Sequence, residues 1–349
     1  MSLVAMAWVP CASTGSNSDS AAAIASLHRA HDRVEAADEE QVRQLIRRWR
    51  CDSVYLDIGS NIGVQVRKLH EPHKYPGSPV LPIFLRAFGP PPRCRTCALG
   101  VEPNLRSHVK LSAVEGNLTR AGVGVHFFEA AAGDAAGMTT LHLQRQRTAG
   151  EDAGASSFDL GFYDRAKTIT REVRVLSLPR LISLVRREIG PRGSGAGSRA
   201  GRIVMKLDVE GQEGTILPAL LETGVLCEVD FAFFEFHADS FKRAAKLKEC
   251  ANATTEESRS ACRMRSRVGE EFFSMHLQPH PWNSGRSRAM AWATVSHRVR
   301  GSAIDYLSNT SRWAARAEPS CPTELLTLDD ESYSHDGQPF PLESLCPAA

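Results

Sequence analysis

The chain has 349 residues, of which 42% are hydrophobic and 23% charged, with a formal net charge of +2. This is an ordinary globular balance, with room for one large domain or two modest ones. The charge balance calls for no acidic partner, and basic clusters such as residues 46–50 are short, so we expect no nucleic-acid binding. No run of 18 apolar residues is present, so we expect no transmembrane segment.

The compartment is left open by two opposing signals. The apolar stretch within residues 1–13 has no basic residue before it and makes a poor signal peptide, which slightly favours the cytoplasm. Glycosylation sequons begin at Asn117, Asn252 and Asn309, which keeps a secretory or Golgi location open. Nine cysteines are too few for a disulfide scaffold, and their odd count leaves at least one unpaired.

The first predicted elements are a disordered N-terminus over residues 1–22 and an amphipathic helical extension over 23–52. Near-continuous apolar strands are then predicted at 53–58, 97–102, 123–128, 203–209 and 228–236, with helices over 61–70, 104–120 and 213–222. Strands that lack alternation and are separated by helices indicate a parallel sheet covered on both faces. With right-handed crossovers, this predicts a doubly wound α/β fold.

Three segments interrupt the pattern. Residues 71–93 contain seven prolines, which predicts an extended loop rather than a helix. Residues 144–170 are polar and rich in Gly and Ala, and we expect a mobile excursion there after a hairpin near 138–143. Residues 190–201 have the composition of a flexible linker. Beyond residue 237 the pattern weakens, although further strands could form at 290–295 and 324–328.

The loop after the first strand reads D-x-G-x-N-x-G from Asp57. Ligands of a parallel sheet bind outside the carboxyl ends of its strands. Gly59 and Gly63 allow a sharp turn and a close backbone approach, and Asn61 tolerates unusual dihedrals. An acid at this position would repel a pyrophosphate, and the G-x-G-x-x-G of dinucleotide-binding proteins is absent. The loop suits a ligand with an ammonium group and hydroxyls, such as S-adenosylmethionine.

Acids also end two other predicted strands. Glu102 ends the second strand, where a carboxylate can accept both hydrogen bonds of a ribose diol. The fourth strand ends in K-L-D-V-E-G-Q-E, which contains Asp208, Glu210 and Glu213. Acids at three strand ends are difficult to explain by packing, since each would be costly if buried without a partner.

Together these residues resemble the FkbM family of S-adenosylmethionine-dependent methyltransferases. The resemblance spans roughly residues 53–237 and rests on YLDIGSNIG, GVEPN, EAAAGDAAG, VRVLSLPRLISLV and KLDVEGQE, in the family's order. It implies a Rossmann-like class I methyltransferase fold, with a mostly parallel seven-stranded sheet and helices on both faces. The implied domain covers 53–300, with loop insertions at 71–93 and 144–170 and a C-terminal extension over 301–349.

The resemblance also implies which residues hold the cofactor, S-adenosyl-L-methionine. The cofactor-binding set is Asp57, Gly59, Ser60, Asn61, Gly63 and Glu102, with Ala131 and Asp134 near the adenine. Pro179 stands where the family usually has an acid, and the proline-rich segment makes the spacing from Asp57 to Glu102 long. Neither departure removes a cofactor residue.

The candidate catalytic residues are Asp208, Glu210 and His237. Asp208 could orient the acceptor or take its proton, or it could be a structural carboxylate that pairs with Lys206 or caps the next helix. His237 has a suitable unperturbed pKa for a general base, although a lone histidine is more often simply hydrogen-bonded. A divalent cation could be held by Asp208, Glu210, His237 and Asp239. The spacing of these residues does not require one, and we expect no metal.

Cys94 and Cys97 form a C-x-x-C motif without a second pair at zinc-finger distance. We therefore favour ordinary packing for these two cysteines over a zinc or redox role.

The sequence as a whole predicts a methyltransferase that acts on a hydroxyl of a small-molecule or glycan acceptor. One alternative is a non-catalytic interaction module that retains the fold, which the intact acids disfavour. Another is a nicotinamide-dependent oxidoreductase, which the missing G-x-G-x-x-G disfavours.

Overall fold

The computed structural model describes eight segments of the chain, over residues 34–144, 156–157, 168–192, 201–210, 212–234, 323–327, 339–340 and 344–347. The predicted disordered segment 1–22, the possible strand at 290–295 and most of the 144–170 and 190–201 segments lie outside the described residues.

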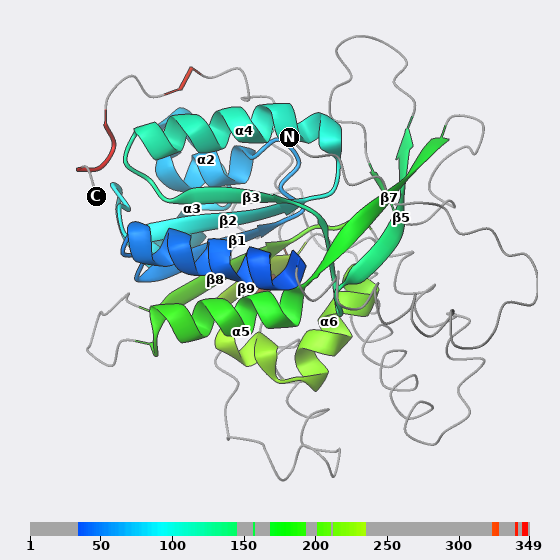
Figure 1. Cartoon of the computed structure of the whole chain (residues 1–349). Coiled ribbons are helices and arrows are strands. Elements are labelled where there is room, and N and C mark those ends of the chain that lie inside the picture. Colours follow the sequence, from blue (N-terminus) through cyan, green and yellow to red (C-terminus); the bar gives the residue numbers. More distant parts are fainter. Residues whose placement is uncertain are drawn as a thin grey trace, which may run out of the picture.

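The main sheet consists of six parallel strands in the order β10-β9-β8-β1-β2-β3 (Figure 1). Its strands are β1 (Ser53–Ile58), β2 (Thr96–Glu102), β3 (Val125–Glu129), β8 (Arg202–Leu207), β9 (Phe231–Phe234) and β10 (Glu324–Thr327). The chain order reverses between β1 and β8, which makes their carboxyl ends the switch point of the sheet. The parallel α/β prediction is confirmed, but the described residues contribute six strands to this sheet, not seven.

Helices cover both faces of the main sheet (Figure 1). One face packs against α2 (Val64–His70), α3 (Leu81–Phe88) and α4 (Leu105–Arg120). The other face packs against a helix over residues 34–48, α5 (Leu178–Ile189) and α6 (Glu213–Glu222). An apolar core lies on each face of the sheet. The central strands β1, β2 and β8 are buried along most of their length, so their side chains contribute to both cores. Among the described residues, no helix is both long enough and apolar enough to cross a membrane.

The proline-rich segment 71–93 is not an extended loop, so this prediction was wrong. It contains the 3₁₀ helix η1 (Pro72–Lys74) and α3. Proline at the start of each helix is tolerated because the first N–H groups of a helix have no intrahelical partner. Between Pro82 and Pro90, the apolar Ile83, Phe84 and Ala87 recur at helical spacing and are buried against the sheet.

A second sheet extends from the carboxyl end of the first, in the order β4-β7-β5-β6. It comprises β4 (Ala131–Gly133), β5 (Gly137–Gln144), β6 (Ser156–Ser157) and β7 (Thr168–Ser177). β5 pairs antiparallel with β7 from Gly137↔Val175 to Gln144↔Thr168. The chain therefore enters and leaves the 144–170 segment through two paired strands. The remaining element is the 3₁₀ helix η4 (Val225–Glu228).

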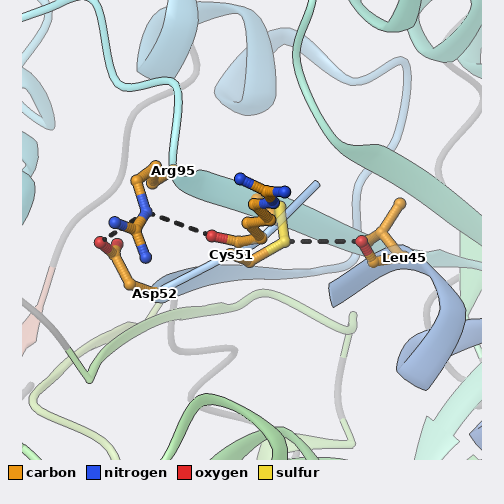
Figure 2. Close-up of a disulfide and its surroundings, with 6 residues drawn as sticks. Leu45, Cys51, Asp52 and Arg95 are labelled. Atoms are coloured by element: carbon orange, nitrogen blue, oxygen red, sulfur yellow. Dashed lines mark hydrogen bonds and ion pairs between the residues drawn. A yellow bond between two sulfur atoms is a disulfide. The ribbon is translucent and has the colours of Figure 1, made fainter. Parts of the chain in front are cut away.

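Disulfides tie the fold together, which corrects the interpretation of Cys94 and Cys97 as ordinary packing residues. Cys97 pairs with Cys51 at a Cα–Cα distance of 5.7 Å, and Cys94 pairs with Cys346 at 5.5 Å. Cys94 precedes β2 and Cys97 is its second residue. Cys97 is bonded to the segment after the 34–48 helix (Figure 2), whereas Cys94 is bonded to the C-terminal residues. Cys227 is disulfide-bonded as well.

Candidate functional site

The predicted cofactor loop lies at the switch point, between the end of β1 and the start of α2. Gly59, Asn61 and Gly63 have positive φ angles of 83°, 49° and 82°. Glycine adopts this region freely and asparagine more readily than other residues, so the sequence D-x-G-x-N-x-G matches the backbone of the loop. The predicted helix at residue 61 begins later, at Val64, because residues 59–63 are consumed by the turn.

Gly59 is required by packing as well as by its φ angle. A Cβ atom at this position would lie 1.6 Å from the carbonyl oxygen of Asp208. The close approach that the glycine permits is thus between the β1 loop and the end of β8. At Gly63 a Cβ atom would meet the side chains of Leu111 and Phe127 at 3.1 and 3.3 Å, so this glycine lets α4 and β3 pack on the loop.

Four backbone N–H groups of the loop, those of Gly59, Ser60, Asn61 and Gly63, are used internally. Those of Gly59 and Ser60 donate to the carbonyl of Val101 at 3.0 and 3.1 Å, and that of Gly63 donates to Ser60 at 2.8 Å. The N–H of Asn61 donates to Glu102 Oε2 at 2.8 Å. An anion cradle needs several unengaged N–H groups that converge on one point, and these four donors do not supply one.

Asp57 is fully buried just before the end of β1. Its Oδ1 accepts a hydrogen bond from the Tyr55 hydroxyl at 3.0 Å, whereas its Oδ2 has no hydrogen-bond partner in the part of the chain that the structure describes. Burial raises the pKa of this carboxyl above its usual range, while the nearby Lys206 opposes the rise. A buried carboxylate oxygen without a donor is costly, so this position is suited to a ligand that brings a donor or a positive charge.

Glu102 is buried at the end of the neighbouring strand β2. Its two carboxylate oxygens accept backbone N–H groups from Asn61 and Asn104, both at 2.8 Å. Burial raises the pKa of Glu102 to about 7, although these hydrogen bonds favour its charged form. A carboxylate offers about four lone-pair sites, so two backbone bonds fix the group while acceptor capacity remains for the hydrogen-bond donors of a ligand.

Asp208 follows β8 and pairs with Lys206, the structural alternative that the sequence left open. The distance from Lys206 Nζ to Asp208 Oδ2 is 2.7 Å, and the same ammonium donates to the carbonyl of Gly59 at 2.9 Å. The two side chains are only 7% and 11% exposed. The pair places a carboxylate beside the loop after β1, with its charge balanced by Lys206.

The other two acids of this motif have different environments. Glu210 is partly exposed, and its φ of 49° places it in a tight turn after β8. Glu213 is fully buried at the start of α6, and its Oε1 accepts the N–H of Val209 at 2.9 Å. This bond ties Glu213 to the backbone of the turn, which is a structural role.

The structure does not bring every predicted residue into this cluster. Ala131 is buried in β4, where it pairs with Val175, and the carbonyl of Asp134 accepts a hydrogen bond from Ser177 at 3.4 Å. Both follow β3 beyond the same edge of the main sheet, but Ala131 belongs to the second sheet and Asp134 lies in the bend after β4. His237, together with Asp239, lies outside the described residues.

Sequence reasoning missed Tyr55 and Gly100 and treated Lys206 only as a possible partner. Tyr55 and Lys206 each stand two positions before an acid, and side chains two apart in a strand point to the same face. This spacing was the available signal. Gly100 has no such signal, but a Cβ atom there would lie 2.2 Å from the Phe127 ring and 2.5 Å from Ser60 Oγ, so only glycine fits beneath the loop.

The described part of the chain contains no cluster of three or more His, Cys, Asp or Glu residues that could hold a metal ion. Comparison of the chain with protein-family models, curated proteins and solved structures finds no match. The interpretation of the site therefore rests on its own geometry.

Proposed function

We propose that the protein is an S-adenosylmethionine-dependent methyltransferase that acts on a hydroxyl of a small molecule or glycan. The observation that carries the proposal is the pair of buried carboxyls, Asp57 and Glu102, at the carboxyl ends of β1 and β2 on either side of the glycine loop. Buried acids at a ligand-binding edge favour a ligand that is cationic and rich in hydroxyls.

Each of these residues has a role in the proposed site. Glu102, held by two backbone N–H groups, accepts hydrogen bonds from a ribose diol. Asp57 Oδ2, which has no hydrogen-bond partner among the described residues, accepts a donor from the ligand. The cofactor when bound supplies a methyl group on a good leaving group, so the protein's contribution is mainly positioning.

Asp208 orients the acceptor hydroxyl or receives its proton at the end of β8. The Lys206 ammonium, 2.7 Å from Asp208 Oδ2, holds this carboxylate in place beside the loop. Glu210 stands in the turn that follows, two residues after Asp208. We retain Asp208 as the principal catalytic candidate of the described residues.

A second candidate, a nicotinamide-dependent oxidoreductase, is favoured by one observation. The main sheet has six parallel strands in the order 3-2-1-4-5-6, counted along the sheet, which is also the order of dinucleotide-binding domains. The engaged N–H groups of Gly59, Ser60, Asn61 and Gly63 argue against it, since a pyrophosphate needs such donors.

Calorimetric titration of the full chain with S-adenosylmethionine, S-adenosylhomocysteine and NAD tests the proposal. We expect micromolar binding of the first two ligands, weakened at least about tenfold, or 1.4 kcal/mol, by Asp57→Asn and by Glu102→Gln. Asp52→Asn is the matched control, because this carboxylate precedes the opposite end of β1 and pairs with Arg95. Binding of NAD alone would favour the oxidoreductase, and no binding by folded protein would favour the interaction module.

A further inference from the structure

All five cysteines among the described residues are in disulfides. The Cys51–Cys97 bond is buried, with residues 6% and 0% exposed, beside the surface ion pair of Arg95 and Asp52 (Figure 2). The Cys94–Cys346 bond joins positions 252 residues apart. Disulfides persist in oxidising environments and are rare in the cytosol. Because every cysteine among the described residues is in a disulfide, the chain is expected to mature in an oxidising compartment.

One glycosylation sequon, Asn117-Leu118-Thr119, lies in the last turn of α4. Leu118 is fully buried against the sheet, whereas Asn117 is on the outer side of the helix, near the exposed Ala113 and Arg120. The Asn117 side-chain amide donates to the carbonyl of Ala113 at 2.7 Å and accepts from Arg120 at 2.6 Å. These contacts lie on the surface, so a group attached to this nitrogen can extend into solvent.

We propose that Asn117 is an N-glycosylation site in a protein that matures in an oxidising secretory compartment. A bond forms between Asn117 Nδ2 and C1 of an oligosaccharide donated by a lipid diphosphate carrier. The C1–O bond to the diphosphate breaks, the lipid diphosphate leaves, and the amide loses one proton. The second amide hydrogen remains on Nδ2, so one donor is left for the carbonyl of Ala113.

A glycan at this site is compatible with an accessible ligand edge. Helix α4 begins next to Glu102, with Asn104 as its N-cap, and Asn117 lies near its other end. Asn117 comes thirteen positions after Asn104, which is about 20 Å along the helix axis. The inference does not depend on the methyl-transfer proposal.

The test is expression of the full chain through the secretory pathway of a eukaryotic host, followed by peptide mass spectrometry. We expect N-glycosidase treatment to convert Asn117 to aspartate in most of the protein. Thr119→Ala should abolish this conversion, and Thr119→Ser, which keeps the sequon, should preserve it. Because the readout is specific to one peptide, modification at Asn252 or Asn309 does not interfere.

Disulfide formation is measured on the same sample by alkylation without reduction. We expect Cys51, Cys94, Cys97, Cys227 and Cys346 to resist alkylation until a reductant is added to the unfolded chain. An unmodified Asn117 in protein whose disulfides have formed would overturn the glycosylation site. Alkylation of these cysteines without reductant would overturn the oxidising compartment.

Discussion

The ammonium of Lys206 lies 2.7 Å from Asp208 Oδ2 and 2.9 Å from the carbonyl oxygen of Gly59. One cation thus ties the end of β8 to the loop after β1, across the switch point where the proposed ligand binds. The pair is well shielded, and Lys206 also opposes the pKa rise that burial causes at Asp57. Its loss should therefore affect both stability and the site.

We expect Lys206→Met to lower the free energy of unfolding by about 3 kcal/mol, because it leaves the Asp208 carboxylate shielded without its cation. Arg47→Met is the control, since Arg47 pairs with Glu188 at 3.6 Å with its side chain 68% exposed. That change should cost less than about 1 kcal/mol. Denaturant unfolding of both variants compares them, and equal losses would contradict a special role for Lys206.

Gly59→Ala should be far more destabilising than Gly77→Ala. The two glycines have nearly the same φ, 83° and 82°, so the conformational cost of about 1–2 kcal/mol is shared. A Cβ atom at Gly59 would also lie 1.6 Å from the backbone oxygen of Asp208, whereas one at Gly77 meets no atom of the described residues within 4 Å. We expect a difference of at least about 2 kcal/mol in unfolding free energy. Similar losses of unfolding free energy in the two variants would show that the loop after β1 and the end of β8 can move apart at little cost.

Much of the main sheet could be predicted from the sequence because its signals are local. The near-continuous apolar runs that form β1, β2 and β8 require burial on both faces, whatever lies beside them. Helix α6 was predicted with both of its ends correct, and β10 was anticipated from the run at 324–328. The loop glycines were predicted as turn residues, and their positive φ angles confirm this.

The features that were missed depend on distant parts of the chain. The partners of Cys97 and Cys94 lie 46 and 252 positions away, and no local pattern specifies such pairs. Helix α3 was not predicted because the proline content of residues 71–93 was taken to exclude a helix. Pro82 lies in the first turn of α3, where a proline is tolerated. The choice for Asp208 between catalysis and pairing with Lys206 also required three-dimensional proximity.

Loss of the Cys94–Cys346 bond should release the C-terminal residues from α4. The N–H groups of Leu345 and Cys346 both donate to the carbonyl of Ala121, at 2.8 and 3.0 Å, and the disulfide holds them there. We expect Cys346→Ser to lower the unfolding free energy by about 2–5 kcal/mol. Hydrogen exchange of these two amides should accelerate, while that of the Asn61 amide, bonded to Glu102, should not. Unchanged protection at residue 345 would show that the backbone bonds hold the segment without the disulfide.

Glu102 should make the stability of the protein depend on pH between about 4.5 and 7. Burial raises its pKa from 4.5 to about 7, so in this window the folded protein holds a proton that the unfolded chain releases. The stabilising contribution is complete below the unfolded pKa and is lost as the pH rises through the folded pKa, by on the order of 3 kcal/mol.

Glu102→Gln isolates this contribution, because glutamine resembles the neutral carboxyl and does not titrate. We expect the unfolding free energy of the native protein to fall more steeply than that of the variant between pH 4.5 and 7, measured by denaturant unfolding at each pH. Asp57, whose pKa burial also raises, is present in both proteins, so its contribution is largely removed by the comparison. Equal dependence of the unfolding free energy on pH in the two proteins would mean that Glu102 takes up no proton on folding. The backbone N–H groups of Asn61 and Asn104 would then keep it ionised throughout this pH range.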